Sequence, residues 1–408
     1  MASAGKHFVA RQPILDHRLK IYAYELLFRS GLENFFDQAT DGDKATKQVI
    51  SDSFLLFGIE KMTGRSRAFI NFTRNLLVQG YPALLPKQYA VVEILENVEP
   101  DREVIKACVN LKKRGYLLAL DDFVYHAKYE PLLKMADIIK VDFRISGPEE
   151  RAELARHLAD YPLRLLAEKV ETKEEFDEGV ALGYELFQGY FFAKPVLVSH
   201  NELPSIKLQY LRMLQELNRP ELSYTRLSEI ISGDLSLSYK LLRYLNSAAF
   251  GLRHEVTNIR QALAMLGEKE IRKWCSLLTL HHLGQDKPQE LVVASVVRAK
   301  LAELIAQRLG MGDKSGDMFL MGLFSLLDAI CGLPLEELLR ELPLSEEVRR
   351  ALLQRSGIGG SILKLLEAQE RGDWQEISRL AAEMGLDESR IPELYVRAVL
   401  FPQEILAA

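Results

Sequence analysis

The stretch "LLALDDF", residues 117–123, joins an apolar run to two adjacent aspartates. The apolar part is typical of a buried β-strand, in which successive side chains point to opposite faces of the sheet. We therefore expect the carboxylates of Asp121 and Asp122 to diverge, with at least one of them directed into the interior or into a site. A buried carboxylate needs a compensating charge, so this stretch bears on both the fold and the function.

Apolar runs of this kind recur through the first half of the chain. Seven of them occur in about 190 residues, and helix-length segments such as 101–115 and 148–162 separate them. This alternation implies mainly parallel strands joined by crossover helices, in either a closed barrel or a doubly wound sheet. Seven runs favour a (β/α)8-like barrel, although a barrel of this type usually takes roughly 250 residues.

The chain changes character near residue 200. After a connector that contains Pro195 and Pro204, apolar residues recur at the i, i+3, i+4 and i+7 positions of amphipathic helices, as in residues 292–310 and 346–354. We therefore predict two domains, a β/α barrel over residues 1–199 and an all-helical domain over residues 200–408.

Composition limits the classes of function. The formal net charge of −5 over 408 residues gives no global basic field, so nucleic acid is an unfavoured partner. Cys108, Cys275 and Cys331 are far apart in apolar surroundings, which indicates reduced thiols rather than disulfides or a zinc site. The N-terminal residues lack the apolar region of a signal peptide, and no run of 18 apolar residues occurs. We expect a cytoplasmic protein that does not span a membrane.

Polar side chains occur at or near the end of each apolar run in the first half. They are Glu25, Asn71, Glu93, Asp121 with Asp122, Lys140 with Asp142, Glu168 and Gln188. In a β/α barrel the carboxyl ends of the strands meet at one mouth, where active sites are built. Carboxylate and amide oxygens are the ligands that suit Mg²⁺ or Mn²⁺. Two such ions about 3.5–4 Å apart are the usual arrangement for phosphodiester hydrolysis.

The blocks "YELLFR", "FINFT", "VEILE", "LALDDF", "IIKVD", "AEKVET" and "FQGYFFAKP" resemble, in order and spacing, the signature of EAL domains. Members of that family are cyclic di-GMP phosphodiesterases with a (β/α)8-like barrel. The resemblance covers about half of the chain. It implies cyclic di-GMP as the ligand and the linear dinucleotide pGpG as the product.

The same resemblance implies a role for each strand-end residue. The first Mg²⁺ or Mn²⁺ ion is expected to bind to Glu25, Asn71, Glu93 and Asp121. The second ion is expected to bind to Asp122 and to share Asp121. Lys140 and Glu168 are expected to position and deprotonate the attacking water, and Gln188 to help hold it. Arg29 is expected to grip a phosphate of the nucleotide through its fork of donors, and Glu96 to anchor the loop that follows the paired aspartates.

The second half resembles the HDOD domain, a helical relative of HD phosphohydrolases that lacks their metal site. The motif "ISGDLSLSYKLLRYLNSAAFG", residues 231–251, and the following "IRQALAMLG" carry this resemblance. HD enzymes bind their metal ions through a His-Asp doublet, whereas here Leu327 stands beside Asp328. The resemblance implies a bacterial signalling protein whose helical domain binds a protein partner.

The chain also departs from the EAL pattern. Typical EAL domains continue after the paired aspartates with a Gly-Thr-Gly-Tyr-Ser loop, but residues 121–133, "DDFVYHAKYEPLL", contain no glycine. The alanine that names the family is Leu26, and the glycine after the presumed base is Lys169. Three functions therefore remain open. The chain is an active, metal-dependent cyclic di-GMP phosphodiesterase, a catalytically weak receptor that binds the dinucleotide and passes the signal to the helical domain, or a scaffold in which both halves bind proteins. The sequence also leaves open whether the chain forms a homodimer.

Overall fold

The computed structural model describes residues 7–30, 59–64, 66–193, 222–232, 258–340 and 344–406, together with residues 210, 213–215, 217, 241, 256 and 342. It divides into two compact units. One contains Met1–Lys194 and Ala368–Ile377, and the other contains Pro195–Glu367 and Ser378–Ala408. Among the described residues no helix is long and apolar enough to cross a membrane.

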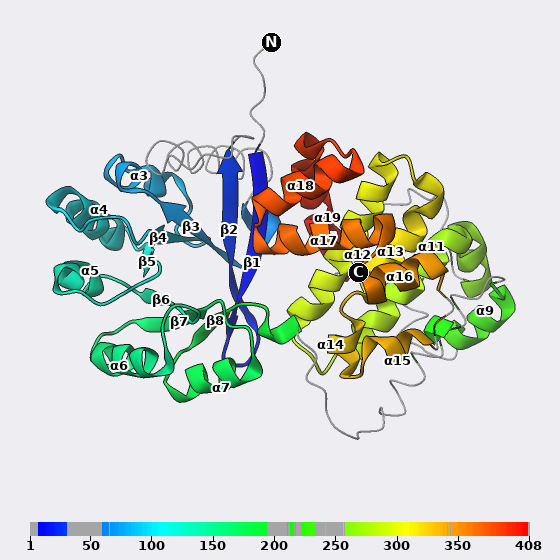
Figure 1. Ribbon diagram of the computed structural model, residues 1–408, viewed down its shortest axis with the longest axis horizontal. Coiled ribbons are helices and arrows are strands. Elements are labelled where there is room, and N and C mark those ends of the chain that lie inside the picture. The colour runs from blue at the N-terminus through cyan, green and yellow to red at the C-terminus, as the bar shows by residue number, and fades with distance from the viewer. Residues whose placement is uncertain are drawn as a thin grey trace, which may run out of the picture. The chain divides into compact units, whose positions relative to one another are not determined.

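The first unit is built on a closed barrel of eight strands (Figure 1). The strands are β1 (His7–Asp16), β2 (Ile21–Ser30), β3 (Arg67–Phe72), β4 (Ala90–Ile94), β5 (Leu117–Leu120), β6 (Ile138–Asp142), β7 (Arg164–Glu168) and β8 (Leu186–Gln188). The seven predicted runs are β2 to β8, and consecutive members of this series pair in parallel. The predicted (β/α)8-like barrel is therefore confirmed.

Strand β1 closes the barrel in the opposite direction. It pairs antiparallel with β2 through a tight turn and antiparallel with β8 on its other side. Because an antiparallel hairpin needs only a short connection, the barrel gains one strand without a crossover helix. This hairpin explains how eight strands fit into fewer residues than a regular β/α barrel uses.

Helices cover the outside of the barrel between the parallel strands. They are α2 (Ile59–Thr63), α3 (Arg74–Val78), α4 (Arg102–Lys113), α5 (Glu130–Leu133), α6 (Pro148–Leu158) and α7 (Lys173–Ala181). Helix α4 shows why these segments are helical: Asp101 caps its first turn by accepting from two backbone N–H groups, and Lys112 and Lys113 occupy the last turn. Its buried residues, which include Val104, Cys108 and Leu111, face the sheet.

The interior of the barrel contains a separate apolar layer. One buried residue from each strand contributes to it: Ile14, Ala23, Phe69, Val91, Ala119, Ile138, Leu166 and Leu186. Because side chains two positions apart on a strand share a face, the next inward position of each strand lies one layer closer to the barrel mouth. This apolar layer is the floor on which the candidate site is built.

The second unit is helical within its described residues. Its helices include α9 (Tyr224–Ser232), α11 (Ile259–Leu283), α12 (Gln289–Arg308), α13 (Ser315–Phe324), α14 (Leu327–Cys331), α15 (Leu335–Arg340), α16 (Glu346–Gln354) and α19 (Ile391–Leu406). Helices α17 (Gly357–Arg371) and α18 (Trp374–Met384) have residues in both units. The predicted helical segments 292–310 and 346–354 correspond to α12 and α16. Most of the motif at residues 231–251 lies outside the described residues.

Candidate metal centre at the barrel mouth

One polar residue from each strand forms the layer directly above the apolar floor. These residues are Gln12, Glu25, Asn71, Glu93, Asp121, Lys140, Glu168 and Gln188. Each lies two positions from the floor residue of its own strand, on the side toward the carboxyl ends of the parallel strands. Asp121 directly follows the last residue of β5, whereas the other seven belong to strands. The strand-end side chains predicted to meet at one mouth do converge there.

Lys140 lies at the centre of this layer. Its side chain is 1% exposed, and its ammonium contacts four carboxylates. The Nζ to oxygen distances are 2.7 Å to Glu168, 2.9 Å to Asp121 and 3.4 Å to Glu25, and Glu93 is also in contact. A single ammonium therefore neutralises only part of a buried negative cluster.

The pKa values reflect this imbalance. Burial raises the pKa of Glu168 to about 8 although Lys140 opposes the shift, and burial likewise raises the pKa of Glu93. Burial alone would lower the pKa of Lys140, but the surrounding carboxylates, Glu168 foremost, raise it. For Asp121, Lys140 outweighs burial, so the pKa of this carboxyl is lowered. Protons or a further cation must supply the missing positive charge.

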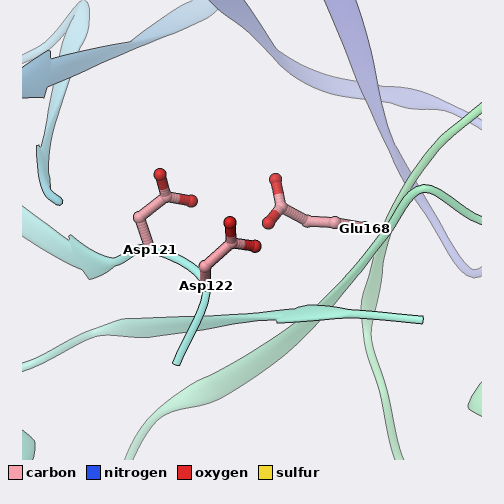
Figure 2. Close-up of side chains that lie close together, drawn as sticks. All are labelled: Asp121, Asp122 and Glu168. Atoms are coloured by element: carbon pink, nitrogen blue, oxygen red, sulfur yellow. The ribbon is translucent and has the colours of Figure 1, made fainter. Parts of the chain in front are cut away.

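Asp121, Asp122 and Glu168 form a tighter group beside Lys140. One oxygen of each carboxylate lies within 4.8 Å of the other two, and Figure 2 shows the three side chains directed toward a common space. The prediction that the two aspartates diverge is wrong. Strand β5 ends at Leu120, and Asp122 has a left-handed backbone with φ of 38°, so the strict alternation of a strand no longer applies.

The chemistry of the donors fits a divalent cation. Glu93 Oε2, Asp122 Oδ1 and Gln188 Oε1 are buried and accept no hydrogen bond. Buried oxygens of this kind are uncommon unless an ion or water completes them. Carboxylates and an amide oxygen are the ligands that Mg²⁺ and Mn²⁺ prefer. The residues present can therefore hold such an ion, which would supply the positive charge that Lys140 alone does not.

The amide of Gln188 links strand β8 to the carboxylates. Its Nε2 donates to Glu25 Oε2 at 2.7 Å and to Gln12 Oε1 at 2.8 Å. Asn71 Nδ2 also donates to Glu25, at 3.3 Å. Sequence reasoning missed Gln12 because β1 runs antiparallel, which places its polar residue before the apolar residue Ile14 rather than after it. Gln12 could have been predicted only if the antiparallel direction of β1 had been recognised in the sequence.

A second ammonium, that of Lys169, lies at the outer edge of the three-carboxylate group. Its Nζ contacts Asp142 and lies 3.9 Å from Asp122 Oδ1. Asp142 is 5% exposed and its Oδ1 accepts from the backbone N–H of Arg144 at 2.7 Å. The sequence identified Asp142 as a strand-end residue and Lys169 as a departure from the EAL pattern, but not the ion pair between them.

Two predicted residues do not join the layer. Glu96 is exposed, and its carboxylate has no hydrogen-bond or ion-pair partner within the described residues; only its backbone carbonyl accepts, from Tyr129 Oη at 3.4 Å. Arg29 belongs to strand β2, but its side chain lies outside what the structure describes. Their predicted roles in loop anchoring and phosphate binding stay predictions.

The helical unit lacks a comparable cluster in its described part, where no group of three His, Cys, Asp or Glu side chains is arranged to hold a metal ion. Asp328 follows Leu327 in α14, and its Oδ1 accepts from the backbone N–H of Ala329 at 2.8 Å. Burial raises the pKa of this carboxyl. The aspartate is thus held by its own helix turn.

Comparison with known proteins identifies two family domains along the chain. The family model of the EAL domain matches residues 25–195, and that of the HDOD domain matches residues 203–341. The cyclic di-GMP phosphodiesterase CdgJ of Vibrio cholerae is 37% identical over 98% of this chain and 93% of its own length. The chain belongs to the EAL–HDOD family. The protein YuxH of Bacillus subtilis is likewise 37% identical, over 98% of this chain and 99% of its own length.

Solved EAL structures are more distant. A structure of Klebsiella pneumoniae BlrP1, described as a calcium/cy-diGMP complex, aligns with a TM-score of 0.39 and 23% identity. The alignment covers 46% of this chain and 55% of that chain. The predicted combination of an EAL barrel and a helical HDOD domain is confirmed by the family models and the full-length relatives.

Proposed function

We propose that the EAL domain binds cyclic di-GMP at the barrel mouth together with Mg²⁺ or Mn²⁺ and hydrolyses it slowly to pGpG. The HDOD domain then relays the bound state to a protein partner. The proposal includes a cytoplasmic location and a domain boundary near residue 200. It assigns metal binding to Glu25, Asn71, Glu93, Asp121 and Asp122, and phosphate binding to Arg29.

The observation that carries the proposal is the incompletely neutralised carboxylate layer around Lys140. Four carboxylates contact one ammonium, and three buried oxygens nearby accept no hydrogen bond. A phosphodiester is an anion and cannot enter such a site unless further cations accompany it. When bound, a divalent cation would stabilise negative charge that develops on the phosphate. The full-length relative CdgJ, named a cyclic di-GMP phosphodiesterase, supports the same ligand.

Glu168 and Lys140 are suited to act on a water molecule. Their charged groups lie 2.7 Å apart, and burial raises the pKa of Glu168 to about 8. A carboxylate whose pKa lies near the working pH can accept a proton from water, and Lys140 can orient it by donation. Gln188, fixed by its bonds to Gln12 and Glu25 on the strand next to Glu168, would help to hold that water.

Slow turnover follows from the segment after Asp122. Val124 is 72% exposed, Tyr125 Oη donates to Glu130 at 3.1 Å, and Glu96 provides no side-chain anchor. This segment therefore does not reproduce a glycine-rich loop. Misplacement of reacting groups by about 1 Å can cost roughly 100-fold in rate, whereas binding tolerates it better. The alternative is a scaffold in which both domains bind only proteins.

Calorimetric titration of the full chain with cyclic di-GMP in Ca²⁺, followed by assay of pGpG in Mn²⁺, tests the proposal. We expect binding in Ca²⁺ and slow hydrolysis in Mn²⁺. Glu168→Ala should abolish hydrolysis and retain binding. Metal alone should raise the melting temperature by linkage, and Asp121→Asn and Glu93→Gln should lose most of that increase. If no divalent cation permits cyclic di-GMP binding, the scaffold is the correct interpretation.

A further inference from the structure

Lys169 has a backbone conformation that an ordinary residue rarely adopts. Its φ is 55°, in the left-handed region, directly after the last residue of strand β7. A glycine would adopt this conformation without strain, and a lysine there costs on the order of 1 kcal/mol. Lys169 therefore places a long cationic side chain at a backbone position that favours glycine.

Asp142 fixes the place of the ammonium. Its side chain is 5% exposed, and its Oδ1 accepts from the backbone N–H groups of Arg144 at 2.7 Å and Ile145 at 3.3 Å. The other oxygen, Oδ2, contacts Lys169 Nζ. Because the carboxylate is locked by two backbone donors in a buried position, the lysine is held by a rigid partner rather than by a mobile surface group.

The ammonium faces the cation-binding side of Asp122. Lys169 Nζ lies 3.9 Å from Asp122 Oδ1, which is buried and accepts no hydrogen bond. Asp122 is one of the three residues that each place a carboxylate oxygen within 4.8 Å of the other two. A unit positive charge at this distance repels a second cation that binds the same oxygen, although the 46% exposure of the lysine side chain reduces the effect by solvent screening.

We propose that Lys169 serves as a built-in cation at the outer edge of this group and weakens the binding of a divalent ion to Asp122. Lys169 thereby sets how much divalent metal the chain needs to fill its site. The inference rests on the proposed metal-dependent function of the barrel mouth. It assigns to Lys169 a positioning and tuning role, without contact to the reacting atoms.

The test is Mn²⁺ titration of the metal-stripped full chain, without nucleotide, by calorimetry. Lys169→Met removes the charge and keeps the length of the side chain, whereas Lys169→Gly removes both the charge and the backbone strain. Both variants should bind the Mn²⁺ ion at Asp122 roughly tenfold more tightly than the unaltered chain, a change of about 1.4 kcal/mol. Lys173→Met, which removes an exposed lysine paired with Asp177, is the matched control and should change nothing.

A double variant locates the effect. Combining Lys169→Met with Asp122→Asn should cancel the gain in affinity, because the repelled ion then lacks its carboxylate. Equal Mn²⁺ affinity in the unaltered chain and both Lys169 variants overturns the inference. A gain in affinity that survives Asp122→Asn overturns it too, as does the absence of Mn²⁺ binding in every form.

Cyclic di-GMP titration of the same samples tests the proposed function separately. If no form binds cyclic di-GMP but the Mn²⁺ affinities of the variants differ as expected, the proposed function is wrong and the role of Lys169 stands.

Discussion

At the residue scale the site is defined by a shortage of positive charge. Lys140 contacts four carboxylates, and Lys169 compensates Asp142 at the rim. The sequence identified which residues end the strands, but not how their charges balance, because ion pairs between different strands, such as that of Lys140 with Glu25, depend on the closed barrel. The left-handed backbone of Asp122 was equally hidden, since nothing in "LALDDF" marks where the strand ends.

The stability of the metal-free protein should depend on the protonation of Glu168. The pKa of this carboxyl is raised to about 8 in the folded state, above its ordinary value, so between about pH 4.5 and 8 the folded chain holds a proton that the unfolded chain has released. The free energy of unfolding should therefore fall as the pH rises through this window, by a few kcal/mol on the scale of about 1.4 kcal/mol per pKa unit.

Urea unfolding in the presence of a chelator, repeated from pH 5 to pH 8, measures this dependence. Glu168→Gln stays neutral and should flatten the profile, whereas Glu174→Gln, which alters an exposed residue of helix α7, should leave it unchanged. If the free energy of unfolding changes with pH in the same way in the unaltered chain and in Glu168→Gln, Glu168 does not hold the proton.

At the element scale the sequence predicted seven of the eight strands and helices such as α4 and α6. Strand β1 was not counted because it pairs antiparallel, and its polar residue Gln12 therefore precedes its apolar floor residue. The periodicity that revealed the other strand ends does not apply to it. The compact loop after β5 could be recognised as unusual from its lack of glycine, but its contacts could not be predicted.

The end of strand β8 depends on one glycine. Gly189 has φ of 147°, and a Cβ there would lie 2.1 Å from the carbonyl oxygen of Val170, whose N–H donates to Gln188 O at 3.0 Å. Gly189→Ala should lower the free energy of unfolding by more than about 3 kcal/mol, because neither backbone can yield without moving Gln188. Gly183 also has a positive φ, of 90°, but has open space around it, so Gly183→Ala should cost only about 1 kcal/mol. Similar urea midpoints for the two variants would contradict this steric argument.

Replacing residues Val124 to Tyr129 by the glycine-rich loop of typical EAL domains should raise the rate of cyclic di-GMP hydrolysis. The present segment is held by side-chain contacts with other parts of the barrel domain, and not by the carboxylate of Glu96. One of these contacts is between the rings of Tyr125 and His157, whose centroids lie 4.0 Å apart. The rate in Mn²⁺ should increase by roughly 10- to 100-fold, while the affinity in Ca²⁺ changes little. If the unaltered chain already hydrolyses cyclic di-GMP as fast as EAL enzymes with the glycine-rich loop, the loop does not limit turnover.

At the scale of the whole molecule, the proposed function assigns catalysis and relay to different units. The described part of the helical unit contains no carboxylate or histidine cluster for a metal ion, and Asp328 is bonded within its own turn. Residues 200–408 alone should therefore release no product from cyclic di-GMP or other nucleotides in Mn²⁺. Metal-dependent hydrolysis by that fragment would mean that the replaced histidine is not essential.

The compact unit that contains the barrel also includes Ala368–Ile377, from far along the chain. Gln369, which is 1% exposed, donates through Nε2 to the carbonyl oxygen of Val9 at 2.6 Å. Gln12 Nε2 donates to the carbonyl oxygen of Glu370 at 3.3 Å, and Tyr190 Oη contacts the Glu370 carboxylate. Strand β1 is therefore held at two points by residues that a barrel ending at residue 199 would lack.

Hydrogen exchange of strand β1 tests this dependence. Amides of His7–Asp16 should exchange faster in a fragment of residues 1–199 than in the full chain, because β1 loses its contacts with Gln369 and Glu370. Gln369→Ala in the full chain should reproduce part of the change, since the partly buried carbonyl of Val9 then loses the bond from Gln369 Nε2. Gln307→Ala, an exposed change in α12, is the control and should leave β1 unaffected. Equal protection of β1 in the fragment and the full chain would show that the first 199 residues form the barrel unaided.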